Sequence, residues 1–120
     1  LKADYAAVAS QFLASMFVES SDPQLQQRIT DDMLATDRAV GVGAIRGMLK
    51  TDVAGALEQI DAPLVVINSD YQPTDLAALQ DYHPNVTLRI MEGVGHFVMM
   101  EDPETFNRLL ETAIQSFAGE

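Results

Sequence analysis

The sequence predicts an α/β fold in which the second half forms a strand–helix–strand–helix unit. Residues 64–67 are a continuous apolar and mostly β-branched run, typical of a strand buried on both faces of a parallel sheet. In residues 86–90, apolar side chains alternate with others, which is the period of a strand. Asp102-Pro103 then begins a helix that continues to about residue 117. We therefore expect a right-handed parallel crossover unit.

The first half is expected to be helical. Apolar residues recur at three- and four-residue intervals over residues 5–17, and we interpret this stripe as core packing, with a substrate-cavity lining as the alternative. Ser21-Asp22-Pro23 ends that helix and begins another. Three glycines in residues 39–50 weaken a helix by roughly 1 kcal/mol each, which predicts short or mobile helices there. Asp52 is the expected cap of a further helix.

Polar segments connect the elements of the second half. Residues 68–75 form a turn-rich loop, and Asp75 or Thr74 is expected to cap the short helix that follows. His83 precedes a proline, which biases it away from helix, so we expect it in a turn without a catalytic role.

The candidate functional residue is His96, which follows the second strand. Gly93 and Gly95 let the backbone turn where a Cβ would clash, and a helix begins a few residues later. His96 therefore belongs to a strand-to-helix loop. In open parallel sheets such loops lie at the carboxyl ends of the strands, where ligands and chemistry are found.

Composition excludes several functions. The 120 residues include 18 acidic and 7 basic residues, for a formal charge of −11, which argues against nucleic acid and anionic membranes as partners. No apolar run approaches the eighteen or so residues that span a bilayer, and we expect a soluble, cytoplasmic protein. His83 and His96 do not form a metal-ligand spacing, and no phosphate-binding motif occurs, so we expect no metal and no cofactor.

Two parallel strands do not make a stable sheet, because both faces must be covered and both edges paired or blocked. We therefore expect missing sheet strands, supplied by an upstream segment of the same parent chain or by a second chain.

Residues 52 to 117 carry a resemblance to a known family. In order they contain Asp52 with Leu57 and Ile60, the segment 62–67, an acidic loop, a second strand, Gly95-His96, and the segment 101–106. This order resembles the C-terminal part of an α/β-hydrolase. The resemblance implies a doubly wound sheet whose last two parallel strands are present here, with residues 1–50 as a helical cap or lid and residues 51–120 as part of the hydrolase core. The upstream core and its nucleophile elbow would be absent.

The resemblance also implies a triad of nucleophile, histidine and acid. His96 matches the catalytic histidine, which takes the proton from the nucleophile and then activates water. Asp70 is our choice for the acid, because it is nearest the end of the first strand. Asp75 and an acid upstream of this chain remain alternatives. Glu101 and Asp102 are expected to serve the last helix.

The nucleophile is missing, since the sequence has no G-x-S-x-G motif. We therefore expect a hydrolase of ester, amide or carbon–carbon bonds that is inactive as the isolated chain, with a serine or aspartate nucleophile supplied from elsewhere. Met91, Met99 and Met100 flank the His96 loop and favour an apolar or acyl small-molecule substrate. The alternatives are a non-catalytic ligand-binding or scaffold protein of the same fold, and a small flavodoxin-like regulatory domain.

Overall fold

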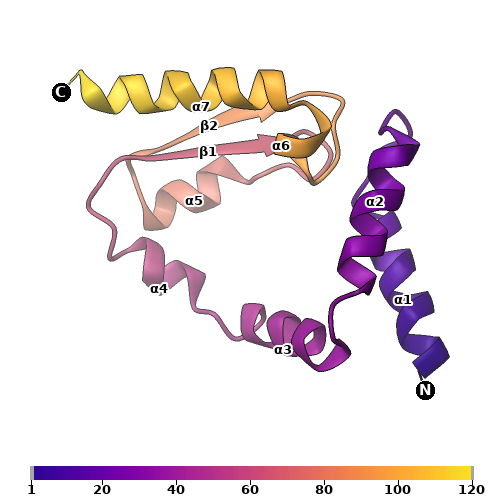
Figure 1. The fold of residues 1–120 in the computed structure, drawn as a ribbon. Coiled ribbons are helices and arrows are strands. Elements are labelled where there is room, and N and C mark those ends of the chain that lie inside the picture. Colours follow the sequence, from indigo (N-terminus) through magenta and orange to yellow (C-terminus); the bar gives the residue numbers. More distant parts are fainter. Residues whose placement is uncertain (1, 120) are drawn as a thin grey trace.

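A computed structural model describes residues 2–119 of the chain, and the side chains of residues 5–119. The described residues form a mixed α/β structure of seven helices and one two-stranded parallel sheet (Figure 1), which confirms the α/β class predicted from the sequence. The elements in chain order are α1 (Lys2–Ala14), α2 (Pro23–Leu34), α3 (Arg38–Met48), α4 (Val53–Leu57), β1 (Leu64–Ser69), α5 (Leu76–Tyr82), β2 (Val86–Met91), α6 (Val98–Glu101) and α7 (Pro103–Ala118).

The sheet is formed by β1 and β2, which are paired in register from Leu64 opposite Val86 to Ser69 opposite Met91. α5 connects the two strands, and Figure 1 shows it on one face of the sheet with α7 on the other. Val86 and Met91, at the two ends of β2, are 2% exposed. The core of the second half is therefore the thin layer between the sheet and these two helices.

Aspartate side chains begin five of the helices. Each accepts a hydrogen bond from a backbone N–H in the first turn, at 2.8–3.0 Å, and so satisfies one of the donors that a helix start leaves free. These caps are Asp22 for α2, Asp37 for α3, Asp52 for α4, Asp75 for α5 and Asp102 for α7. Part of the acidic excess of the sequence is thus explained by local helix stabilisation.

The helical half packs incompletely. α1 and α2 contact each other, and Leu13, Phe17 and Ile29 are buried there. Other members of the apolar stripe are open to solvent, with Phe12 50% exposed, so the predicted core packing holds for only part of the stripe. α3 is one continuous helix of 11 residues, not the short pieces predicted from its glycines, but none of its residues is buried.

The chain is more open than a compact domain of its length. Its radius of gyration is 16.8 Å, whereas about 14 Å is expected for 120 residues. Its accessible surface is 8529 Å², about 2,100 Å² more than the roughly 6,400 Å² typical of a folded monomer of this mass. Figure 1 shows the reason: α3 and α4 form an arm that leaves α1 and α2 far from most of the sheet.

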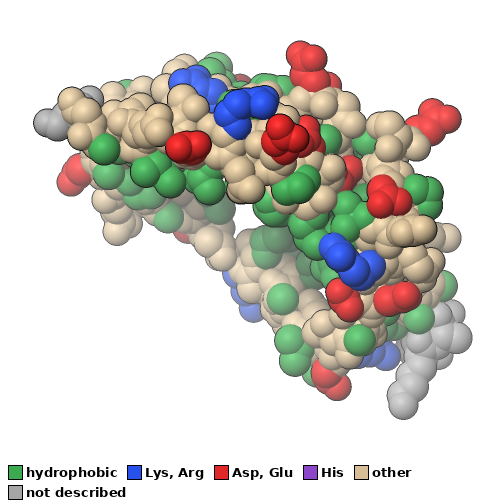
Figure 2. Space-filling view, turned by 45° about the horizontal axis from the view of Figure 1, so that its top comes forward, with side chains coloured by type: hydrophobic (Ala, Val, Ile, Leu, Met, Phe, Trp, Pro, Cys, Tyr) green, Lys and Arg blue, Asp and Glu red, His purple; other side chains and the backbone are tan. Residues whose placement is uncertain are grey.

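The surface carries both exposed hydrophobic side chains and acidic side chains. Figure 2 shows hydrophobic side chains along the underside of the sheet-containing layer and inside the hollow beside it, with acidic side chains scattered around them. None of the helices formed by residues 2–119 combines the length and the apolar character needed to cross a bilayer.

Candidate functional site

The backbone of the His96 loop is determined by its two glycines, for different reasons. Gly93 has a φ of 72°, in the left-handed region that favours glycine. Gly95 is needed for space, because a Cβ there would lie 2.5 Å from the carbonyl oxygen of Met16 and 3.0 Å from Cα of Phe17. The prediction that a Cβ would clash is confirmed for Gly95, and the clash is with the helical half of the chain.

His96 lies beyond the carboxyl end of β2, on the loop that leads to α6. Its backbone N–H donates a hydrogen bond of 2.7 Å to the carbonyl of Met16, and its side chain is exposed. The imidazole stands edge-on to the ring of Phe97, with centroids 5.3 Å apart and planes at 87°. Among residues 5–119, no hydrogen bond is made to the imidazole nitrogens. The imidazole therefore contacts Phe97 along one edge, and the His96 side chain is otherwise accessible to solvent.

Asp70 follows β1 directly and lies at the same edge of the sheet. Its N–H donates to the carbonyl of Met91 at 3.1 Å, and its side-chain Oδ1 accepts from the N–H of Gly93 at 3.1 Å. The structure thus joins the Asp70 loop to the His96 loop. The hydrogen bond of this carboxylate is made to the loop backbone three residues before His96, and not to the imidazole.

The loop after β1 is shaped by its own polar side chains. Asn68 Nδ2 donates to Thr74 Oγ1 at 2.7 Å and to the carbonyl of Gln72 at 3.2 Å. The hydroxyl of Tyr71 donates to the carbonyl of Ser15 at 2.9 Å, so this loop also contacts the end of α1. These bonds place Asp70 at the start of an ordered turn.

The alternative residues have structural roles in the described part of the chain. Asp75 caps α5 by accepting from the N–H of Ala78 at 3.0 Å. His83 is 3% exposed, and its Nε2–H donates to the carbonyl of Ala62 at 3.0 Å, which ties the end of α5 to the segment before β1. The prediction that His83 marks a turn at the end of a helix is confirmed.

The sequence predicts that Glu101 serves the last helix, and this prediction is wrong. Its carboxylate accepts from the N–H groups of Gly95 (3.0 Å) and Phe97 (3.2 Å) and from the hydroxyl of Ser21 (2.6 Å). It therefore holds the His96 loop. No local pattern in the sequence predicts the bond to Ser21, because Ser21 is 80 residues away.

Asp102, in contrast, does serve the last helix as predicted. The hydrogen bond from the backbone N–H of Thr105 is the main cause that lowers the pKa of the Asp102 carboxyl below its ordinary value of 3.8. The side chain of Thr105 and the positive charge of Arg108 act in the same direction, and desolvation acts against them.

The turn between α1 and α2, residues 15–21, lies against this edge of the sheet, as Figure 1 shows at the arrowheads of the strands. Besides the bonds to Ser15 and Met16, the hydroxyl of Ser20 donates to the carbonyl of Gly93 at 3.2 Å. The rings of Phe17 and Phe97 pack together with centroids 5.2 Å apart. The helical half thus contacts both candidate loops at once.

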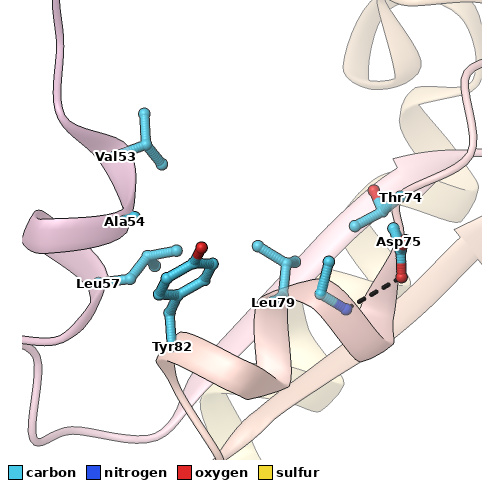
Figure 3. A pocket seen from close by; sticks show the side chains of 8 residues that line it. Val53, Ala54, Leu57, Thr74, Asp75, Leu79 and Tyr82 are labelled. Carbon is cyan, nitrogen blue, oxygen red and sulfur yellow. Dashed lines mark hydrogen bonds between the residues drawn. The ribbon is translucent and has the colours of Figure 1, made fainter.

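An open apolar groove of about 360 Å³ lies elsewhere, between α4 and α5 (Figure 3). Val53 and Leu57 of α4 face Leu79 and Tyr82 of α5 across it. Its lining also includes Ala54, Thr74, Asp75 and Ala78. His96 and Asp70 do not line this groove, so it is separate from the candidate site at the ends of the strands.

Comparisons with known proteins identify no relative from which residue roles could be transferred to this site. We found no family model, no curated protein and no solved structure that matches the chain. Among the described residues, no group of three or more histidine, aspartate or glutamate side chains is placed to hold a metal ion.

Proposed function

We propose that this chain is the C-terminal part of an α/β-hydrolase, in which His96 is the catalytic base and Asp70 its acidic partner. The observation that carries the proposal is the hydrogen bond between Asp70 Oδ1 and the N–H of Gly93, 3.1 Å long. It brings the two candidate loops together at the carboxyl edge of a parallel sheet, the edge at which open α/β folds carry out their chemistry. The exposed imidazole of His96 is open to a reacting molecule there.

In this proposal His96 removes the proton from a serine nucleophile and then activates the water that completes hydrolysis. Asp70 accepts a hydrogen bond from the imidazole after its side chain rotates away from the N–H of Gly93. This bond keeps the imidazole in the productive tautomer. A serine nucleophile would give cleavage of an ester, amide or carbon–carbon bond. An aspartate nucleophile, as in dehalogenases and epoxide hydrolases, would keep His96 in the water-activating step.

The open edge of β1 supports the proposal that further strands complete the sheet. Within residues 2–119, β1 pairs with β2 only, and in a parallel ladder the N–H groups of Val65 and Ile67 point to the other edge. The outer edge of β2 is partly occupied, because the N–H of Val86 donates to His83 and its carbonyl accepts from Gln80. We therefore place the missing strands beside β1.

The excess surface agrees with a large partner. About 2,100 Å² of surplus accessible area exceeds the roughly 800 Å² that each protein contributes to a standard interface. This supports completion by a substantial part of a sheet with its helices, from the same parent chain or from a second chain. The nucleophile and the oxyanion hole would come with it.

The seating of residues 15–21 on the His96 and Asp70 loops supports a cap role for the helical half, residues 1–50. A cap over this edge would cover the site and contribute apolar lining from exposed side chains such as Phe12. Met99 and Met100, both exposed beside the loop, add flexible apolar surface. We therefore propose an apolar or acyl small-molecule substrate.

The test is hydrolysis by the completed protein. The tagged chain is recovered from its source cells with whatever completes its sheet, then treated with acyl p-nitrophenyl esters and with a fluorophosphonate, which labels activated serines. We expect turnover and a labelled serine outside residues 1–120. His96→Ala should lower the turnover by at least about a thousandfold.

Asp70→Asn and Asp75→Asn form a matched pair, since each removes one carboxylate from the same loop. Only Asp70→Asn should lower the rate, because an asparagine at position 75 can still cap α5. Turnover that is unchanged in His96→Ala would refute the proposal. Ligand binding without any turnover in the wild type would instead favour a non-catalytic ligand-binding protein of this fold. The groove of about 360 Å³ between α4 and α5 would then be the candidate binding site.

A further inference from the structure

The carboxylate of Glu101 binds the loop on both sides of His96. Oε2 accepts from the N–H of Gly95 at 3.0 Å, and Oε1 accepts from the N–H of Phe97 at 3.2 Å. The N–H between them, that of His96, donates to the carbonyl of Met16 at 2.7 Å. Three consecutive backbone donors are therefore satisfied, and the backbone that carries the imidazole is fixed at each of them.

The same carboxylate connects this loop to the helical half. Ser21 is 8% exposed, and its hydroxyl donates to Glu101 Oε2 at 2.6 Å while accepting from the N–H of Val18 at 3.0 Å. Hydrogen bonds to an ionised acceptor are shorter and about twice as strong as neutral ones. The single charge of Glu101 thus orders the turn between α1 and α2 and the His96 loop together.

A ring contact continues this connection to the imidazole. The Phe17 ring lies 5.2 Å from the Phe97 ring, and Phe97 in turn lies 5.3 Å from the imidazole of His96 at nearly a right angle. If Phe97 moves, the support of the imidazole moves with it. The hydrogen bond from the N–H of Phe97 to Glu101 fixes the backbone from which this ring projects.

Capping of α7 does not account for the contacts of Glu101. Asp102 already caps α7 by accepting from the N–H of Thr105 at 3.0 Å, so α7 gains nothing from its neighbour in this respect. All the hydrogen bonds that Glu101 accepts in the described residues go to the His96 loop and to Ser21.

We infer that Glu101 is a positioning residue for His96, and that through Ser21 it couples the orientation of the imidazole to the seating of the α1–α2 turn on the sheet. The inference rests on the proposed function for its catalytic meaning, because a fixed imidazole matters most where it is the base. The structural part of the inference, that one carboxylate fixes the His96 loop, can be tested in this chain without any enzymatic activity.

The test compares Glu101→Gln with Glu104→Gln. Both variants remove one negative charge near the start of α7, but Glu104 is exposed and makes no side-chain hydrogen bond in the described residues. A glutamine at 101 has one acceptor oxygen and presents an NH₂ group to the other donors, so it cannot satisfy all three. Amide hydrogen exchange in the full chain is measured by NMR at Gly95, His96 and Phe97.

The readout is the exchange rate of these three amides relative to the ladder amides of Val66 and Arg89 in β1 and β2. This ratio corrects for any general loss of stability. We expect it to rise at least about tenfold in Glu101→Gln, as the loss of a charge-assisted bond predicts, and to stay unchanged in Glu104→Gln. Ser21→Ala, which keeps the carboxylate, should give a smaller rise. An unchanged ratio in Glu101→Gln would refute the inference.

A second readout distinguishes positioning from simple support. The imidazole protons of His96 experience the ring current of Phe97, and they should move toward their unstructured chemical shifts in Glu101→Gln only. A loosened loop with an unmoved His96 signal would also count against the inference. Failure of the proposed function would appear differently, as absence of hydrolysis in the completed wild-type protein while these NMR results still hold.

Discussion

Gly95→Ala is the substitution whose effect follows most directly from the structure. The new Cβ would lie 2.5 Å from the Met16 carbonyl oxygen, 2.8 Å from Glu101 Oε1 and 3.0 Å from Cα of Phe17. Two of these atoms belong to the backbone, so no side-chain rotation can remove the overlap. The loop must move away from the α1–α2 turn.

That movement has a cost that can be worked out from its parts. Overpacking of this kind costs about 1–3 kcal/mol. The displaced loop also loses the 2.7 Å bond from His96 to Met16 and strains the 3.0 Å bond from Gly95 to Glu101, at roughly 1 kcal/mol for each bond lost. We expect a total destabilisation of about 2–4 kcal/mol. The glycine's φ contributes nothing to this figure, because only Gly93 among the described glycines has a positive φ.

Urea unfolding, followed by far-UV circular dichroism, measures this loss. Gly43→Ala is the matched control, since a Cβ at Gly43 in α3 meets nothing within 4 Å. There the substitution should leave stability unchanged or raise it by about 0.5–1 kcal/mol, because alanine favours the helix. If Gly95→Ala unfolds at the same urea concentration as Gly43→Ala, the contact between the loop and the helical half does not exist in solution.

Three further substitutions separate structural from functional side chains. His83→Ala removes the buried bond to Ala62 and should destabilise the chain by about 2 kcal/mol in the same urea assay, whereas an unaltered midpoint would contradict its structural role. His96→Ala, at an exposed side chain, should change the free energy of unfolding by less than about 0.5 kcal/mol, and a larger loss would show that the ring supports the fold. Asp102→Asn tests the pH dependence of stability. Folding lowers the pKa of the Asp102 carboxyl below its ordinary value of 3.8, so the carboxylate stabilises the folded chain above pH 3.8. This stabilisation is lost as the pH falls below that value. The wild-type midpoint should therefore fall more steeply than that of the variant during acid titration, and parallel curves would refute the role of the Thr105 bond.

Much of the fold was predictable because its signals are local. The β-branched run of β1 and the alternation in β2 need only the neighbouring residues to be recognised. The same holds for the aspartates that cap α2, α4, α5 and α7, since a cap acts within one helical turn. Gly93 and Gly95 were also correctly identified as positions that need glycine.

The site was only partly predictable, because its contacts join distant segments. Glu101 has the appearance of a helix-start acid, and only the folded chain brings Ser21 to it. The exposure of Phe12 was equally hidden, since an apolar stripe looks the same whether its partner is present or absent. The roles of His96 and Asp70 stay predictions until the completed protein is assayed.

The contacts between the α1–α2 turn and the sheet have a consequence for sequence divergence. Tyr71 and His96 donate to the main-chain carbonyls of Ser15 and Met16, so these bonds depend on the path of the backbone and not on the side chains found there. Substitutions at positions 15 and 16 can therefore leave these two hydrogen bonds between the α1–α2 turn and the loops intact. Ser21 is different, because its own hydroxyl makes the bond to Glu101. The side chains of Phe17, Ser20 and Ser21 make their own contacts with the loop, so conservation around this turn is expected at these three positions and not at 15 and 16.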